Sequence, residues 1–158
     1  DSTYNASPGS MGVVIDNFSN LADSLYPDYE KILVLGEMRE LGDYSKDEHE
    51  KLAKKSFGIT KNIFVVGEDM NKYFIPKSQE IGNKNVLFYK NSKLLGADLK
   101  SFIENKTQKY IILFKGSQNT IFLEESVKIL QLNKKDNSKV CRQQKFWLDN
   151  KNIFFNNY

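Results

Sequence analysis

The stretch that decides the fold is Tyr110-Ile-Ile-Leu-Phe-Lys-Gly116, a continuous apolar run that ends in a lysine and a glycine. Continuous apolar runs rich in β-branched residues are typical of strands that are buried on both faces. Weaker runs of the same form occur at Lys31-Ile-Leu-Val-Leu-Gly36, Asn62-Ile-Phe-Val-Val-Gly67 and Asn85-Val-Leu-Phe-Tyr89. We therefore expect four strands in the interior of the protein.

Amphipathic helical patterns alternate with these runs. Apolar residues at three- and four-residue steps predict a helix over 10–25, with Pro8 at its start and Ser7 as its N-cap. Ser45-Lys-Asp-Glu48 has the form of a capping box and predicts a second helix that Gly58 closes. The remaining helices are expected at 93–105, at 120–132 and within the aromatic tail 139–158. This alternation predicts an α/β fold, a Rossmann-like three-layer αβα sandwich with a mainly parallel sheet.

Composition excludes several classes of protein. The 158 residues are 40% hydrophobic and 27% charged, as expected for a soluble domain. No apolar run approaches the roughly 18 residues of a membrane span, and the polar start does not resemble a signal peptide. We therefore expect a cytoplasmic protein without membrane insertion. The net charge of +3 comes mostly from lysines scattered among acids, which argues against nucleic-acid binding.

The residues that most often bind metals are scarce. Cys141 is the only cysteine, so the chain has no internal disulfide and fits a reducing compartment. His49 is the only histidine, and clusters of acids at ligand spacing are not evident. We assign no metal site, and we expect His49 to have a buried hydrogen-bonding or an exposed role rather than a catalytic one.

Three polar segments that contain glycine are expected at or near the carboxyl ends of strands, where open α/β sheets bind ligands. They are residues 1–10, 36–42 and 115–120. The first segment precedes a helix N-terminus, whose free N–H groups favour an anion. By the residues alone, it could equally be a capped loop whose side chains satisfy its own backbone.

The other two segments carry cations. In Gly36-Glu-Met-Arg-Glu-Leu-Gly42, Arg39 could bind a phosphate or carboxylate, although pairing with Glu37 or Glu40 is the simpler interpretation. In Phe114-Lys-Gly-Ser-Gln-Asn-Thr120, a lysine, backbone N–H groups and a hydroxyl share a turn, a combination that suits the same anions. This turn is not a Walker A loop, and Gly-Ser alone is common in turns.

Taken in order and with their spacing, these segments resemble the C-terminal domain of MurF-type ligases. Members of that family carry Asp-Asp-Ser/Thr-Tyr-Asn-Ala-Asn/Ser-Pro-x-Ser-Met before a helix, then Gly-Asp-Met-x-Glu-Leu-Gly with a later His, and finally Val-Lys-Gly-Ser before a helix starting near Met-Glu. The counterparts here are Asp1 to Met11, Gly36 to Gly42 with His49, and Phe114 to Ser117 with Leu123-Glu124. The resemblance spans about residues 1–132. Ser2, Glu37 and Gln118 depart from the family pattern, and the tail has no counterpart in it.

The resemblance implies an ATP-dependent ligase that adds D-alanyl-D-alanine to a UDP-muramyl peptide through an acyl phosphate. It implies an acceptor-binding group formed by Tyr4, Asn5, Lys115, Gly116 and Ser117. It also implies that Asp1, Asn5, Glu37 and Arg39 lie near the nucleotide. ATP and Mg²⁺ would be bound mainly by a central domain, and the UDP-sugar by an N-terminal domain, both absent from these residues. No catalytic residue is expected in this chain, which alone should bind no cofactor and be inactive.

We expect residues 1–133 to form the acceptor-binding domain and 134–158 to form a helical tail packed on it. The first residues are typical of the interior of a longer protein cut at a domain boundary. The alternative is a stand-alone Rossmann-like module that binds a nucleotide or peptide or serves as an interaction domain. Another Mur-type or folate-glutamate ligase is a third possibility, but Tyr4-Asn5-Ala6 and Lys115-Gly116-Ser117 favour the dipeptide-adding branch.

Overall fold

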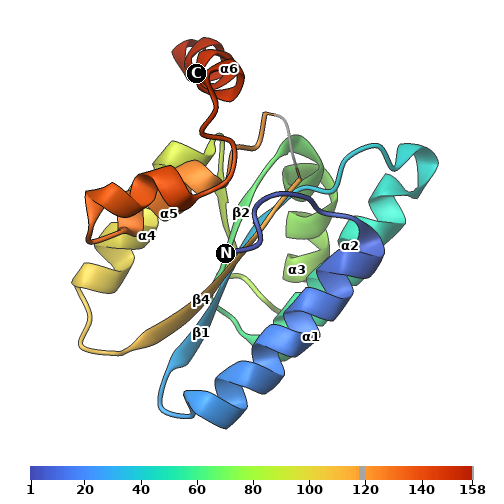
Figure 1. Cartoon of the computed structure of the whole chain (residues 1–158). Coiled ribbons are helices and arrows are strands. Elements are labelled where there is room, and N and C mark those ends of the chain that lie inside the picture. Colours follow the sequence, from blue (N-terminus) through green and yellow to red (C-terminus); the bar gives the residue numbers. More distant parts are fainter. Residues whose placement is uncertain (118–119, 158) are drawn as a thin grey trace.

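A computed structural model describes residues 1–117 and 120–157 (Figure 1). Helices and strands alternate along the chain. The larger elements are α1 (Pro8–Leu25), β1 (Glu30–Gly36), α2 (Ser45–Ile59), β2 (Ile63–Val66), α3 (Ile75–Glu80), β3 (Leu87–Tyr89), α4 (Ser92–Glu104), β4 (Tyr110–Lys115), α5 (Glu124–Leu130) and α6 (Lys145–Asn156). The shorter turns of helix are η1 (Gly42–Tyr44), η2 (Met70–Phe74) and η3 (Lys134–Lys139).

The sheet is parallel and has the strand order β3-β2-β1-β4. Its centre is β1, in which Leu33 pairs with Ile63 of β2 and Leu113 of β4. Alternate residues of a strand point to opposite faces, so Leu33 and Leu35 enter one core while Ile32 and Val34 enter the other. The four predicted strands and the parallel α/β sandwich are confirmed.

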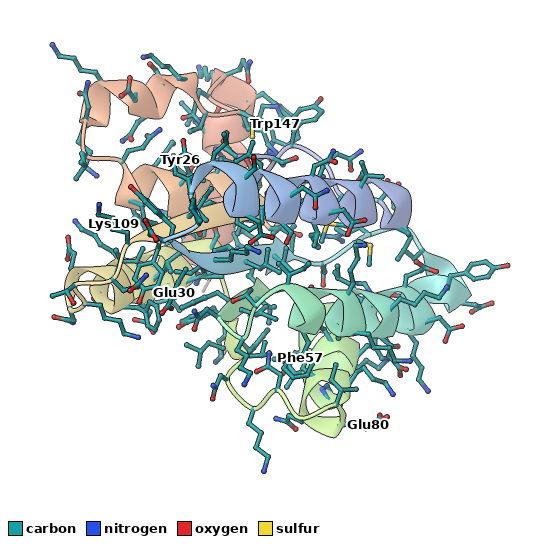
Figure 2. The ribbon with its side chains drawn as sticks, turned by 90° about the horizontal axis from the view of Figure 1, so that it is seen from below. Tyr26, Glu30, Phe57, Glu80, Lys109 and Trp147 are labelled. Carbon is teal, nitrogen blue, oxygen red and sulfur yellow. The ribbon has the colours of Figure 1, made fainter. Side chains whose placement is uncertain are left out.

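Each face of the sheet is covered by its own helices (Figure 1). Helices α1, α2 and α3 lie on one side, where Met11, Ile15 and Leu52 are buried against β1 and β2. Helices α4 and α5 lie on the other side, where Leu95 and Leu99 are fully buried. Figure 2, seen from below, shows Phe57 and Glu80 of the first group on the side of the molecule away from Trp147 of α6.

The N-terminus of α1 is capped as predicted. The Ser7 hydroxyl accepts the Ser10 N–H at 3.4 Å, and the Ser10 hydroxyl accepts the Ser7 N–H at 2.9 Å, which completes a capping box. The capping box predicted at Ser45 is wrong, because Ser45 is already inside α2 and its hydroxyl donates to Asp69. Helix α2 also continues through Gly58 and ends at Ile59.

Two helical segments differ from prediction. Helix α5 begins at Glu124 instead of near 120, because Thr120 and Phe122 have positive φ angles of 52° and 43°, which no right-handed helix accommodates. The segment formed by η2 and α3 was not predicted at all. It buries Met70 and Phe74 against the sheet, so tertiary packing stabilises a segment that lacks a long amphipathic pattern.

The tail after Leu132 forms η3 and then α6. Its aromatic side chains gather around Phe122, whose ring centroid lies 6.5 Å from that of Trp147 and 5.5 Å from that of Phe154. Figure 1 shows α6 beyond α5, at the end of the molecule where the strands terminate. The helix expected within the tail is therefore present, at Lys145–Asn156. No described helix is both long and apolar enough to cross a membrane.

Candidate functional site

The three polar segments meet at the carboxyl edge of the sheet. Ser2 pairs with Lys115 at the end of β4, and its N–H donates to the Phe114 carbonyl at 2.8 Å. Gly36 and Gly116 lie back to back, since a Cβ added at Gly36 would be only 3.1 Å from the Gly116 Cα. The predicted convergence is confirmed. It falls between β1 and β4, where the strand order reverses and open α/β sheets bind ligands.

Lys115 is a buried cation where the first and third segments meet. Its ammonium donates to the Asn5 carbonyl at 2.5 Å and to the Ser2 hydroxyl at 3.4 Å. Only 3% of the residue is exposed, and burial lowers the pKa of Lys115 below its ordinary value of 10.5. No carboxylate of the described residues forms an ion pair with it. Burying an ammonium without a counter-ion lowers the free energy of unfolding. A buried cation of this kind is typical of a site that binds an anionic ligand.

The other residues of the predicted acceptor group differ in their burial and in their contacts. Ser117 is buried, and Gly116 packs on Gly36. Asn5 meets Lys115 through its backbone carbonyl, while its side chain accepts the Ala6 N–H at 2.8 Å. Tyr4 is 66% exposed, and its ring centroid lies 5.6 Å from the guanidinium carbon of Arg142.

His49 anchors the loop after β1. Its Nε2 accepts the Met38 N–H at 3.1 Å, and its Nδ1 lies 2.7 Å from the Ser45 carbonyl. This pairing requires the neutral tautomer with the proton on Nδ1. The ring is fully buried, so of the two predicted roles, buried hydrogen bonding and exposure, His49 has the first. Through Met38, His49 fixes the loop that carries Glu37 and Arg39.

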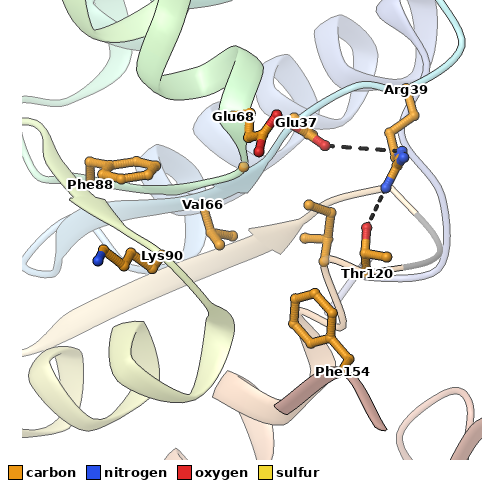
Figure 3. A pocket seen from close by; sticks show the side chains of 10 residues that line it. Glu37, Arg39, Val66, Glu68, Phe88, Lys90, Thr120 and Phe154 are labelled. Carbon is orange, nitrogen blue, oxygen red and sulfur yellow. Dashed lines mark hydrogen bonds and ion pairs between the residues drawn. The ribbon is translucent and has the colours of Figure 1, made fainter. Parts of the chain in front are cut away.

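A hollow of about 490 Å³ lies beside this loop, at the carboxyl ends of the strands (Figure 3). Arg39 borders it, donates to the Thr120 hydroxyl, and lies 4.0 Å from Glu37, so the simpler interpretation of Arg39 as the partner of Glu37 also applies. Glu37 accepts the Asp69 N–H at 3.0 Å. The hollow is lined by Glu37, Arg39, Val66, Gly67, Glu68, Phe88, Lys90, Thr120, Ile121 and Phe154.

The predicted residues therefore fall into two places. Glu37 and Arg39 line the hollow, whereas Lys115 and Ser117 lie outside its lining, at the end of β4. Asp1 is exposed and its carboxylate accepts the Thr3 N–H at 3.0 Å, so it also lies outside the hollow. Gln118, one of the departures from the family pattern, lies outside the residues that the structure describes.

Seven lining residues lie outside the three predicted segments, namely Val66, Gly67, Glu68, Phe88, Lys90, Ile121 and Phe154. The first five lie at or just after the ends of β2 and β3, so their position in or after apolar runs was a usable signal. Phe154 comes from α6, and no local pattern links it to this edge. Within residues 1–117 and 120–157, no group of three or more His, Cys, Asp or Glu residues gathers to hold a metal ion.

Comparison with known proteins gives matches among solved structures. No protein-family model and no curated protein matches the sequence. The MurF ligase of Thermotoga maritima in complex with ADP is 25% identical, with a TM-score of 0.58 over 87% of this chain and 28% of that one. Two MurF structures from Acinetobacter baumannii are 26% and 24% identical, with TM-scores of 0.61 and 0.62 over 81% of this chain and 26% of theirs.

The chain spans about a quarter of the length of these ligases. The fold and this similarity support a MurF-like Mur ligase C-terminal domain.

Proposed function

We propose that this chain is the acceptor-binding domain of an ATP-dependent ligase that joins D-alanyl-D-alanine to a UDP-muramyl peptide. The similarity to MurF ligases supports the reaction class. The observation that carries the acceptor role is the buried ammonium of Lys115, which lies at the carboxyl end of β4 without a carboxylate partner among the described residues.

Lys115 has room to bind a carboxylate. An ammonium has three N–H donors, and the described residues accept two of them, through the Asn5 carbonyl and the Ser2 hydroxyl. The third can form a charge-assisted hydrogen bond to the carboxylate of the dipeptide, with the Ser117 hydroxyl as a second donor. Holding the carboxylate end leaves the amine of the dipeptide free to attack the acyl phosphate. Closure of the domain over the reaction centre would keep water away from that intermediate.

Only one of the residues predicted near the nucleotide fits a phosphate. Arg39 has a side chain that is 42% exposed at the rim of the hollow. The carboxylate of Glu37 instead accepts a hydrogen bond from the Asp69 N–H, and its negative charge would repel a phosphate. We propose that Arg39 approaches the nucleotide while the rest of the ligase holds ATP and Mg²⁺. The chain alone would then have no ligase activity, and ATP- and peptide-dependent phosphate release by the purified chain would contradict this.

The acceptor role can be tested with Lys115→Ala in the complete ligase. We expect the KM for D-alanyl-D-alanine to rise by about ten- to a hundredfold, the usual effect of losing a charge-assisted hydrogen bond, while the KM for ATP is unchanged. Lys109→Ala is a matched control, because Lys109 immediately precedes β4 at the opposite edge of the sheet. Unchanged dipeptide kinetics in the Lys115 variant would refute this role.

A further inference from the structure

The segment that carries Tyr4 and Asn5 is held by two cations from distant parts of the chain. On one side, Lys115 of β4 donates to the Asn5 carbonyl. On the other side, Arg142 of the tail donates to the Thr3 carbonyl at 2.7 and 3.1 Å and to the Tyr4 carbonyl at 3.2 Å. Three successive backbone carbonyls are thus bound by cationic side chains.

Arg142 is itself held firmly in place. Its guanidinium is buried and lies 3.3 Å from the carboxylate of Glu124, the first residue of α5. Lys151 of α6 completes the cluster, since its ammonium lies 2.7 Å from Glu124 and donates to the Arg142 carbonyl at 2.9 Å. The backbone of Arg142 has a φ of 56°, a conformation that costs free energy in a residue with a side chain and persists only where the surroundings enforce it.

A general packing role does not require this chemistry. Burying an arginine and a glutamate costs several kcal/mol of desolvation, and apolar side chains would often join the tail to the domain at least as well. What an arginine adds is a planar fork that binds two neighbouring carbonyls at once and fixes the backbone between them. The fork here is directed at the segment next to Lys115.

We propose that Arg142 is a positioning residue for acceptor binding, an inference that rests on the proposed function. By binding the Thr3 and Tyr4 carbonyls, Arg142 fixes the segment whose next carbonyl, that of Asn5, accepts from Lys115, and so holds the ammonium where its third N–H can meet the carboxylate of the dipeptide. The tail, which has no counterpart in the family pattern, thereby takes part in forming the acceptor site.

The first test measures the positioning itself, by hydrogen exchange in the 158-residue chain. The Ser2 N–H, which donates to the Phe114 carbonyl, reports whether the segment stays docked. Arg142→Lys keeps the charge but loses the fork, so we expect exchange at Ser2 to be about tenfold faster while the Leu113 N–H within β4 is unchanged. Phe155→Leu is the control, because it alters the packing of α6 on Phe122 at a residue outside the contacts of Arg142 described above.

The second test measures dipeptide kinetics in the complete ligase. We expect Arg142→Lys to raise the KM for D-alanyl-D-alanine by about tenfold with kcat and the KM for ATP unchanged, and Phe155→Leu to change none of these. Glu124→Gln, which loosens Arg142 from its other side, should act in the same direction and serves if the arginine variant does not fold.

Parallel measurements on Lys115→Ala separate the two hypotheses. If Lys115→Ala raises the dipeptide KM and Arg142→Lys does not, Arg142 has no positioning role and the proposed function stands. If neither variant changes it, the acceptor assignment fails and this inference fails with it. Exchange at Ser2 that is unchanged in Arg142→Lys would also overturn the inference.

Discussion

Lys115 and His49 are both buried polar residues near the carboxyl edge of the sheet, and they differ in how fully they are paired. His49 uses both ring nitrogens in hydrogen bonds to the backbone of residues 38 and 45. Lys115 has two neutral acceptors for three donors and no carboxylate among the described residues. A fully paired side chain stabilises the fold, whereas a partly paired buried cation is more useful to a ligand than to stability.

This difference predicts a pH dependence that is specific to Lys115. Burial lowers its pKa below 10.5, so the charged form costs stability at every pH below the folded-state pKa. That cost disappears as the pH rises through the folded-state pKa and past the unfolded value. We therefore expect the free energy of unfolding of the wild type, relative to Lys115→Met, to increase as the pH rises towards and through 10.5.

Urea denaturation of both proteins across this range measures the difference. The other ionisable groups are common to both proteins, so their contributions largely cancel from the comparison. A difference that stays constant, or that favours Lys115→Met as the pH rises, would contradict a lowered pKa at Lys115.

At the scale of elements, the site depends on how closely the ends of β1 and β4 approach. Gly36 and Gly116 allow the two turns to touch, and Ile121 fills the space beside Gly36. The close contact between these two turns also accounts for the start of α5 at Glu124 instead of near residue 120. The chain passes through left-handed residues at 120 and 122 so that Ile121 and Leu123 enter the core before the helix starts.

Gly36→Ala tests this close approach. The added Cβ would lie 2.7 Å from the Ile121 Cγ2 and 3.1 Å from the Gly116 Cα, so we expect the free energy of unfolding to fall by about 1–3 kcal/mol. Gly58→Ala in α2 is a matched control, because its added Cβ meets open space and should stabilise the protein by about 0.5–1 kcal/mol. Denaturant unfolding of both variants would refute the argument if Gly36→Ala were as stable as the wild type.

At the scale of the whole molecule, the tail joins elements that are distant in sequence. Arg142 and Lys151 reach Glu124 of α5, and Arg142 also reaches the first residues of the chain. Lys151 and Lys128 both bind Glu125. Burial alone would raise the pKa of Glu125, but hydrogen bonds from these two lysines outweigh burial, and the net pKa is lowered. The division into a domain at 1–133 and a tail at 134–158 remains a prediction, and these contacts suggest that the two parts fold together.

Deletion of residues 134–158 tests whether the tail completes the domain. Without Arg142 and Lys151, Glu124 loses both cationic partners, and we expect the free energy of unfolding to fall by about 3–5 kcal/mol. The sharper test is Glu124→Gln in each background. The substitution should destabilise the intact chain, where it breaks two ion pairs, and stabilise the truncated one, where it removes an unpaired charge. The same sign in both backgrounds would contradict the role of the cluster.

The sequence by itself determined the four strands, the α/β class, most of the helices and the meeting of three polar segments at one edge. Apolar periodicity and the alternation of elements are local properties, and parallel strands bring their carboxyl ends together whatever else the chain does. His49 and Lys115 could be found in this way because each lies in or near one of these segments. The N-cap of α1 could also be predicted from the sequence, because the two residues that form it, Ser7 and Ser10, are three residues apart.

Only the tertiary structure decided which distant groups pair with one another. Ser45 donates to Asp69 instead of capping α2, Phe154 reaches the hollow from α6, and Arg142 binds carbonyls about 139 residues earlier in the chain. These contacts form because a buried polar group must find a partner wherever the packed elements provide one. No local pattern encodes that choice, because it depends on how the strands, helices and tail pack together in three dimensions.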